Sequence, residues 1–312
     1  MMVVIDYKKA MQILVRSILI NNMKRKKAQK TKKISKNEIY NLMAKKLQNG
    51  TLNDDEYSIV EQYYSLQAPS KIYRYRPEDS REIKALVENK IWFSALTELN
   101  DPFEFNTRTD IESILASEND IQGKMQAMSF SKKRFLLKEI AEEINKDSSF
   151  QEILFDFTIA CFSEKKDSLL MWGHYSSGHR GICVEYDTMD LNSFSGKTVI
   201  PVSYSNVLPA ITSTDETALQ RLALKLMATK FSDWEYECEW RCIQDKGACG
   251  ETWTPKGALL DSSPPTAIYL GCKSEGEFVD SLIHICKNAL QIPLYKMTKS
   301  KEEYKLLPER IV

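Results

Sequence analysis

From residue 71 onward the sequence alternates short strand-like and helix-like segments without a repeating β-α-β order, which limits the fold more than any other feature. Residues 71–76 alternate in the manner of a strand and stop at Pro77, and residues 83–87 carry apolar side chains at helical spacing. Residues 91–94 predict a second short strand. No glycine-rich dinucleotide-binding turn follows either strand. We therefore expect an α+β fold whose sheet is mixed and mainly antiparallel, with flanking helices.

The second half of the chain is richer in predicted strands. We expect strands at residues 157–162, 181–187, 199–204, 234–243, 267–270, 293–297 and 304–307. We expect helices at residues 168–175, 214–230 and 275–290.

The sequence predicts three parts. Residues 1–36 form a basic N-terminal leader, residues 37–70 a small helical hairpin with a linker, and residues 71–312 the main α+β domain. Residues 110–155 are charged and helix-like, and we expect them to form an insertion in the main domain.

The net charge of the chain is zero, because 43 Lys and Arg residues balance 43 Asp and Glu residues. This total argues against binding to nucleic acid or membrane by bulk charge. The leader is different, since it holds 11 basic residues and a single acidic one, Asp6, for a net charge of +10 that leaves −10 on the remainder. It is either an arm for nucleic acid or another anionic surface, or a solvated tail.

Apolar runs and cysteines indicate the compartment. No apolar run reaches the roughly 18 residues that a membrane span needs, and the N-terminus lacks the order of a secretory signal. The seven cysteines form no CxxC pair and fit no zinc spacing. We therefore expect a cytoplasmic protein with reduced thiols, no membrane association and no metal site.

Two arginines alternate with two tyrosines in the strand predicted at residues 71–76. In an extended strand Arg74 and Arg76 share one face, and Tyr73 and Tyr75 share the other. Two guanidinium groups on one face can fork around a phosphate or a carboxylate. A structural pair of salt bridges on the sheet is the alternative.

The segment Asn100-Asp101-Pro102-Phe103-Glu104 predicts a tight loop. Pro102 holds Asp101 in an extended conformation, and Asn and Asp side chains readily stabilise turns. The loop is either a structural turn or a ligand loop in which Asn100 or Asp101 bonds a ribose or a base.

Two of the three histidines fall within the helix predicted at residues 168–175 and the loop after it. His174 is a candidate proton carrier, and a histidine with satisfied bonds in the core is the alternative. Trp172 and Tyr175 are candidates for stacking on a ligand ring.

Three glutamates alternate within residues 234–241. On a strand, Glu235, Glu237 and Glu239 line one face, and Arg241 follows on the same face. Carboxylates in a row repel one another unless cations face them, and Arg74, Arg76 and Arg241 are the candidate partners. One of them could stabilise an oxocarbenium-like sugar or activate a nucleophile; an exposed charged face is the alternative.

An ordered set of motifs spans about residues 71–310: YRYRP, WFS, LNDPFE, CFSEKKDSLLMWGHY, GICVEYD, WEYECEWR and IYLG. Together they resemble the bacterial family known as domain of unknown function 2971. The resemblance implies an accessory gene of the kind that sometimes neighbours phage-defence loci.

A weaker resemblance is to the ADP-ribosyltransferases. It implies that Arg74 or Arg76 fills the early-strand position, with Glu239 as catalytic acid and Glu237 assisting. The Ser-Thr-Ser step of those enzymes is absent here, and Trp92-Phe93-Ser94 stands in its place. The implied substrate is NAD.

Our leading expectation is an NAD-using transferase or glycohydrolase in defence or stress. Arg74 and Arg76 would hold the pyrophosphate, Trp172 or Tyr175 would stack on a ring, and Glu239 would stabilise the ribosyl cation. The first alternative is a non-enzymatic sensor or antitoxin-like module with a protein partner. The second is a nucleic-acid-directed enzyme that uses the leader for affinity and the carboxylates for Mg²⁺.

Overall fold

The computed structural model describes residues 33–49, 52–110, 112–114, 156–193, 197–212 and 216–312, together with residues 129, 131, 132, 135 and 154. The chain divides into two units, Met1–Ser35 and Lys36–Val312, and the elements described below belong to the second. Almost all of the predicted leader and most of the predicted insertion lie outside the described residues.

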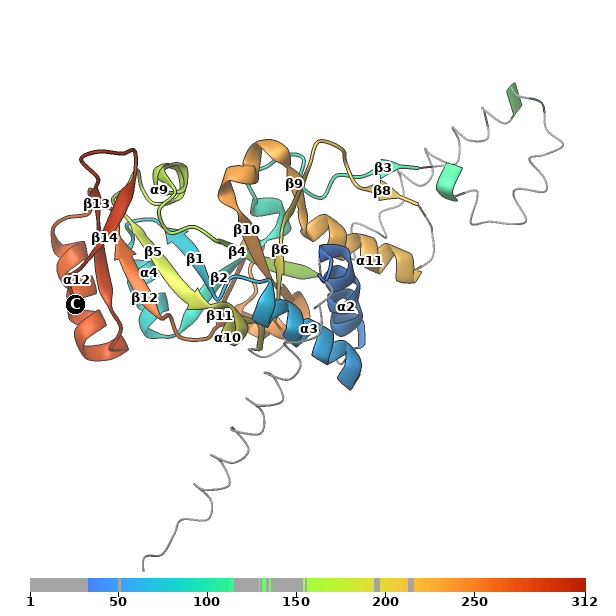
Figure 1. The fold of residues 1–312 in the computed structure, drawn as a ribbon. Coiled ribbons are helices and arrows are strands. Elements are labelled where there is room, and N and C mark those ends of the chain that lie inside the picture. Colours follow the sequence, from blue (N-terminus) through green and yellow to red (C-terminus); the bar gives the residue numbers. More distant parts are fainter. Residues whose placement is uncertain are drawn as a thin grey trace, which may run out of the picture. The chain divides into compact units, whose positions relative to one another are not determined.

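Within the described residues, a ten-stranded sheet forms the centre of the second unit (Figure 1). Its main path runs in the order β11 (Gly257–Asp261), β2 (Lys90–Ala95), β4 (Phe157–Ser163), β1 (Lys71–Arg76), β5 (Ile182–Asp187), β12 (Ala267–Leu270), β13 (Leu294–Lys299) and β14 (Leu306–Arg310). Off this path, β10 (Glu239–Asp245) pairs with β4, and β6 (Thr198–Pro201) pairs with β10. In this sheet β12–β13 is parallel and the other pairings are antiparallel, which confirms the predicted fold class.

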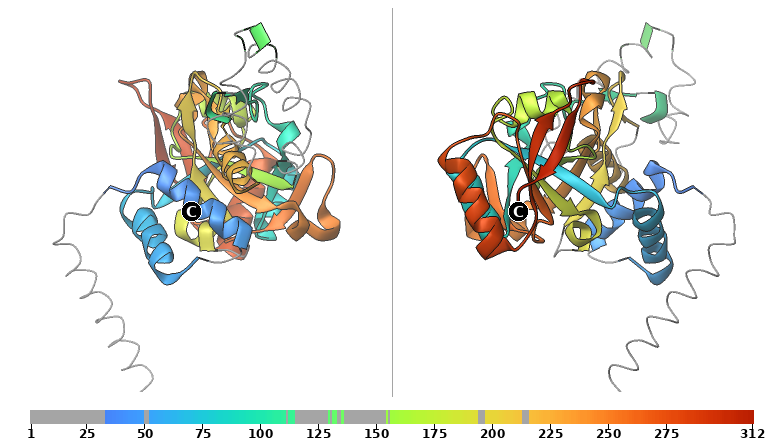
Figure 2. Two further views of the ribbon diagram at one scale, coloured as in Figure 1. Left: turned by 90° about the vertical axis from the view of Figure 1, so that its right-hand side faces the viewer. Right: turned by 60° about the vertical axis from the view of Figure 1, so that its left-hand side comes forward.

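Helices pack at both ends of the sheet (Figure 2). At the β6 end lie α2 (Lys36–Asn49), α3 (Asp54–Leu66) and α11 (Glu216–Met227). The hydroxyl of Tyr40 on α2 donates to the carbonyl of Pro201 over 2.8 Å, and that of Tyr64 on α3 donates to Val199. The predicted hairpin therefore packs on the main domain and does not stand apart from it. α12 (Glu277–Ile285) contacts α4 (Ser80–Val87), which in turn contacts β2.

The remaining elements are short. They are β3 (Arg108–Thr109) with β8 (Ala210–Ile211), β7 (Ser203–Ser205) with β9 (Thr229–Phe231), the helices α9 (Leu169–Tyr175) and α10 (Thr188–Ser193), and the helical turns η1 (Leu96–Glu98), η2 (Ser232–Glu237), η3 (Lys246–Thr252) and η4 (Cys286–Leu290). None of the described helices has the length and apolar character that a membrane crossing requires.

The sheet splits beside β4, because β10 runs along all of one edge and two strands share the other. β1 meets this second edge at Ser163, whereas β2 meets it at Ile159. Arg74 lies at the split, where its Nη1 donates to the carbonyl of Cys161 over 3.2 Å and its Nη2 to that of Trp92 over 2.6 Å. In a continuous sheet these two carbonyls would accept hydrogen bonds from backbone N–H groups of a neighbouring strand. Here the guanidinium of Arg74 donates to them instead.

Gly271 follows β12 and allows the backbone of this strand to approach the turn after α9. A Cβ added at Gly271 would overlap the backbone carbonyl of His179. We expect Gly271→Ala to lower the free energy of unfolding by about 1–3 kcal/mol, because backbone has to shift. Gly173→Ala on α9 is the control, since nothing lies within 4 Å of the added Cβ. It should raise stability by about 0.5–1 kcal/mol in urea unfolding, and equal effects of the two changes would contradict this packing.

Candidate functional site

The split in the sheet opens onto a cavity of about 250 Å³. Its walls come from β1, the segment after β2, β4, α9 and the segment from β9 to β10. Six residues singled out from the sequence line it: Arg74, Arg76, Asn100, Tyr175, Glu237 and Glu239. Glu104 and Lys230 line it as well. The fold thus brings together most of the predicted site residues.

A sharp turn in the chain places the two inner glutamates. The strand predicted at residues 234–243 is wrong in its first part, because η2 extends to Glu237 and Cys238 has the left-handed φ of 44°. The hydroxyl of Ser163 donates to the carbonyl of Glu237 over 2.6 Å, and the backbone N–H of Glu239 donates to the hydroxyl of Tyr204 over 2.7 Å. These bonds fix the turn from which β10 begins.

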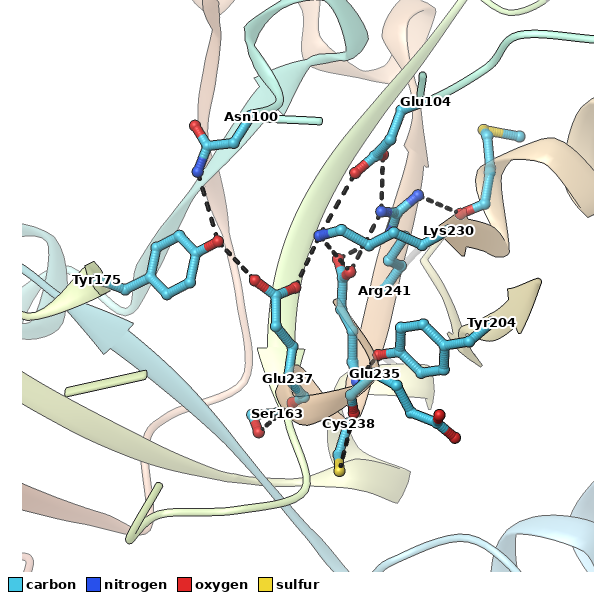
Figure 3. A network of polar contacts seen from close by, with 12 residues as sticks. Asn100, Glu104, Ser163, Tyr175, Tyr204, Lys230, Glu235, Glu237, Cys238 and Arg241 are labelled. Atoms are coloured by element: carbon cyan, nitrogen blue, oxygen red, sulfur yellow. Dashed lines mark hydrogen bonds and ion pairs between the residues drawn. The ribbon is translucent and has the colours of Figure 1, made fainter. Parts of the chain in front are cut away.

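Lys230, at the centre of β9, joins three carboxylates (Figure 3). Its Nζ lies 2.7 Å from Glu237 Oε2, 3.1 Å from Glu239 Oε2 and 3.5 Å from Glu104 Oε1. The side chains of all four residues are at most 6% exposed. A lysine from β9 therefore holds together the glutamates that the turn presents.

Arg241 is the second cation of this network, and its side chain is fully buried. Its Nε lies 2.8 Å from Glu239 Oε1 and its Nη2 lies 2.7 Å from Glu104 Oε2. Its Nη1 donates to the carbonyl of Met227 at the end of α11 over 2.8 Å. The prediction that Arg241 neighbours Glu239 on one strand face is confirmed.

The buried charges set the protonation of the network. Burial alone would raise the pKa of the Glu239 carboxyl, but the charges of Arg241 and Lys230 overcome it and hold this pKa at about 2. Burial lowers the pKa of Lys230, but the three carboxylates raise it by more, so the net change is a rise. Burial also raises the pKa of Glu104, which Arg241 only partly offsets. At neutral pH, Glu239 is therefore ionised and Lys230 is a cation.

Glu237 and Glu239 differ in how they face the cavity. Both carboxylate oxygens of Glu239 are held by cations. Glu237 gives only Oε2 to Lys230, while its Oε1 accepts a bond of 2.5 Å from the hydroxyl of Tyr175. Burial and the bond to Glu237 raise the pKa of Tyr175, which keeps this hydroxyl a donor. The amide of Asn100 reaches the same hydroxyl at 3.5 Å.

The two arginines of β1 have different surroundings. Arg74 is 6% exposed, its guanidinium lies 5.6 Å from the centre of the Phe162 ring, and burial together with the charge of Arg76 lowers its pKa to about 10. No carboxylate of the described residues forms an ion pair with it, and its Nη1 and Nη2 donate to backbone carbonyls. Arg76, by contrast, pairs with Glu82 of α4.

Two predicted residues lie outside the cavity wall. His174 is exposed, with its ring 6.3 Å from that of Tyr175 and 6.2 Å from that of Tyr236. Trp172 is fully buried, and its indole N–H donates to the carbonyl of Lys166 over 2.8 Å. Its ring meets Tyr75 edge-on and stacks with His179, so neither face is open to a ligand. The prediction that Trp172 stacks on a ligand is therefore wrong, because its ring packs in the core.

Lys230 and Glu104 belong to the site although no motif in the sequence marks them as site residues. Glu104 was noted only as the end of a loop, and Lys230 is a single lysine after an amphipathic helix. The sequence offered Arg74, Arg76 and Arg241 as the cations that face the glutamates. Of these, Arg241 pairs with Glu239, whereas Arg74 bonds backbone carbonyls and Arg76 pairs with Glu82. The second cation is Lys230. Among the described residues, no group of three or more His, Cys, Asp or Glu side chains could hold a metal ion.

The network predicts loss of stability in acid. The pKa of Glu239 is depressed from 4.5, so its contribution is present above pH 4.5 and is lost as the pH falls through about 2. We expect this group to contribute up to about 3 kcal/mol of the fall in unfolding free energy between pH 5 and pH 2. Urea unfolding at several pH values measures it. Glu239→Gln should show a shallower dependence over this range, and an unchanged slope would contradict the assignment.

The middle of the chain matches a known protein family. Residues 171–242 match the family model described as protein of unknown function (DUF2971). This match confirms the predicted family resemblance. The matched segment holds Tyr175, Lys230, Glu237, Glu239 and Arg241, whereas the β1 arginines lie before it. No curated protein and no solved structure matches the chain.

Proposed function

We propose that the protein cleaves the N-glycosidic bond of a nucleotide such as NAD, by hydrolysis or by transfer of the ribosyl group. One observation carries this proposal: the Glu237 carboxylate lines the same cavity as Arg74, a buried guanidinium with no carboxylate partner among the described residues. Cleavage of this bond builds positive charge on the ribose, and the substrate itself carries phosphate. The Glu237 carboxylate can stabilise the positive charge on the ribose, and the Arg74 guanidinium can bind the phosphate.

Glu237 is the carboxylate that suits this chemistry, in place of the expected Glu239. The oxygens of Glu239 are occupied by Lys230 and Arg241, so it positions these cations and does not react. In the proposed step the bond between ribose C1′ and the ring nitrogen breaks, and nicotinamide leaves with the electron pair. The oxygen of water or of an acceptor bonds to C1′, and its proton passes to Glu237.

The direct test is to incubate the protein with NAD and to measure free nicotinamide by chromatography. We expect release in proportion to protein concentration, with ADP-ribose or a ribosylated acceptor as the second product. A protein that leaves NAD intact, with and without candidate acceptors, would contradict the proposal.

A nucleotide-binding module without turnover is the second candidate. Each charged group of the Lys230 network has an ion-pair partner, and each side chain is at most 6% exposed. Fully paired, buried charges favour a structural role over a reactive one. This candidate predicts saturable binding of NAD without release of nicotinamide. The alternative of a nucleic-acid-directed enzyme depends on the basic leader, and almost all of the leader lies outside the described residues.

A further inference from the structure

A second cavity, of about 270 Å³, is lined by the loop at residues 101–106 and shares Glu104 and Lys230 with the first cavity. Its walls come from this loop, from residues 205–209 and from the region where α11 leads into β9, and they are mainly apolar. Phe103 and Phe231 line it and are 61% and 39% exposed. Aromatic side chains left in water beside a cavity indicate a binding surface.

Asp101 gives this apolar cavity a polar group. The residue is 6% exposed, and its Oδ1 accepts the backbone N–H of Phe103 over 2.9 Å. Its Oδ2 is shielded from water and has no hydrogen-bond partner among the described residues. A buried carboxylate oxygen without a partner is costly, so a donor group that enters beside it would recover a missing bond.

Backbone strain is present in the same loop. Phe105 lines the cavity with a φ of 63°, in the left-handed region that bulky side chains rarely adopt. Such strain persists where the surrounding structure enforces it and is concentrated at functional sites. Three features of the cavity wall thus point to one ligand site: the open rings of Phe103 and Phe231, the unpartnered Asp101 oxygen and the strained Phe105.

We propose that this cavity binds a planar aromatic ring with an exocyclic amino group, of the adenine class. A carboxylate only accepts hydrogen bonds, so Asp101 selects a ring that donates and rejects one with a carbonyl at that position. Exposed phenylalanine rings bind bases by stacking. The volume is sufficient, since an apolar cavity of about 150 Å³ already holds benzene. The site goes beyond the proposed function, because the ring need not belong to a molecule that is cleaved.

Calorimetric titration of adenosine and inosine tests the proposal, because adenosine carries a donating amino group where inosine carries an accepting carbonyl. The wild-type protein should bind adenosine at least 10-fold more tightly than inosine. In Asp101→Asn the amide can donate to the inosine carbonyl while Oδ1 keeps the turn, so the preference should fall below threefold. Equal affinities in the wild type, no saturable binding of either nucleoside, or an unchanged preference in Asp101→Asn would overturn the proposal.

Two further variants separate recognition from folding. Phe103→Ala removes a ring that is mostly in solvent, so the fold should persist while both nucleosides bind at least fivefold more weakly. Asp233→Asn is the matched control, since Asp233 is exposed and does not line the cavity. It should leave both dissociation constants within twofold, and a change equal to that of Asp101→Asn would overturn the proposal. These titrations do not depend on NAD turnover, so either proposal can fail alone.

Discussion

Replacing Arg241 with methionine should lower the free energy of unfolding by about 3–5 kcal/mol, because removal of one partner leaves the others as uncompensated buried charges. Arg241 is fully buried and pairs with both Glu239 and Glu104. Methionine keeps much of the side-chain volume, so the loss of charge dominates. Urea unfolding followed by tryptophan fluorescence measures the effect.

Arg81→Met is the matched control, because the Arg81 side chain is 89% exposed and pairs with Asp79 at the surface. It should leave the urea midpoint of unfolding close to that of the wild type. Adding Glu239→Met to Arg241→Met should recover part of the loss, since the second change removes one of the stranded charges. A cost below about 1 kcal/mol for Arg241→Met would show that the network is not the buried unit described above.

Glu237→Gln should reduce the rate of nicotinamide release from NAD by about 10³-fold or more, while the protein stays folded. The amide keeps the size of the side chain and can still bond Tyr175, but it lacks the charge that would stabilise the ribosyl cation. The change should appear in kcat, with KM altered much less, because it acts on the transition state. Initial rates over a range of NAD concentrations measure both constants.

Glu235→Gln controls for changes on the same turn. Glu235 is exposed on η2, two residues before Glu237, and does not line the cavity. It should leave kcat within about twofold of the wild-type value. Equal rates in wild type and Glu237→Gln would remove Glu237 from the proposed chemistry, whatever the substrate.

Local pattern was sufficient to predict several elements. The strand before Pro77 is β1, and the apolar spacing at residues 83–87 marks α4. These signals lie within a few neighbouring residues, so the sequence carries them directly. β11 was not predicted, because residues 257–261 carry no clear alternation of polar and apolar side chains.

The site depended on contacts that the sequence does not state. The pairing of Lys230 with Glu104 joins residues that are distant in the chain, and no periodicity reveals it. The alternation around Glu237 suggested a strand, but the left-handed backbone at Cys238 turns the chain there. The gap that Arg74 fills exists only because two strands share one edge of β4. The residue types thus indicated which segments carry the charged side chains of the site. The partner of each charged side chain depends on tertiary contacts that the sequence does not show.

Titration of NAD into the Glu237→Gln protein tests most directly whether the cavity beside Arg74 is a nucleotide site. This variant should bind NAD without consuming it, so calorimetry can report the equilibrium. In the Phe103→Ala background, which weakens the adenine-class cavity, we expect saturable binding that Arg74→Met weakens at least 10-fold while the protein remains folded. Absence of saturable binding at millimolar NAD, or equal binding after Arg74→Met, would contradict the assignment of this cavity.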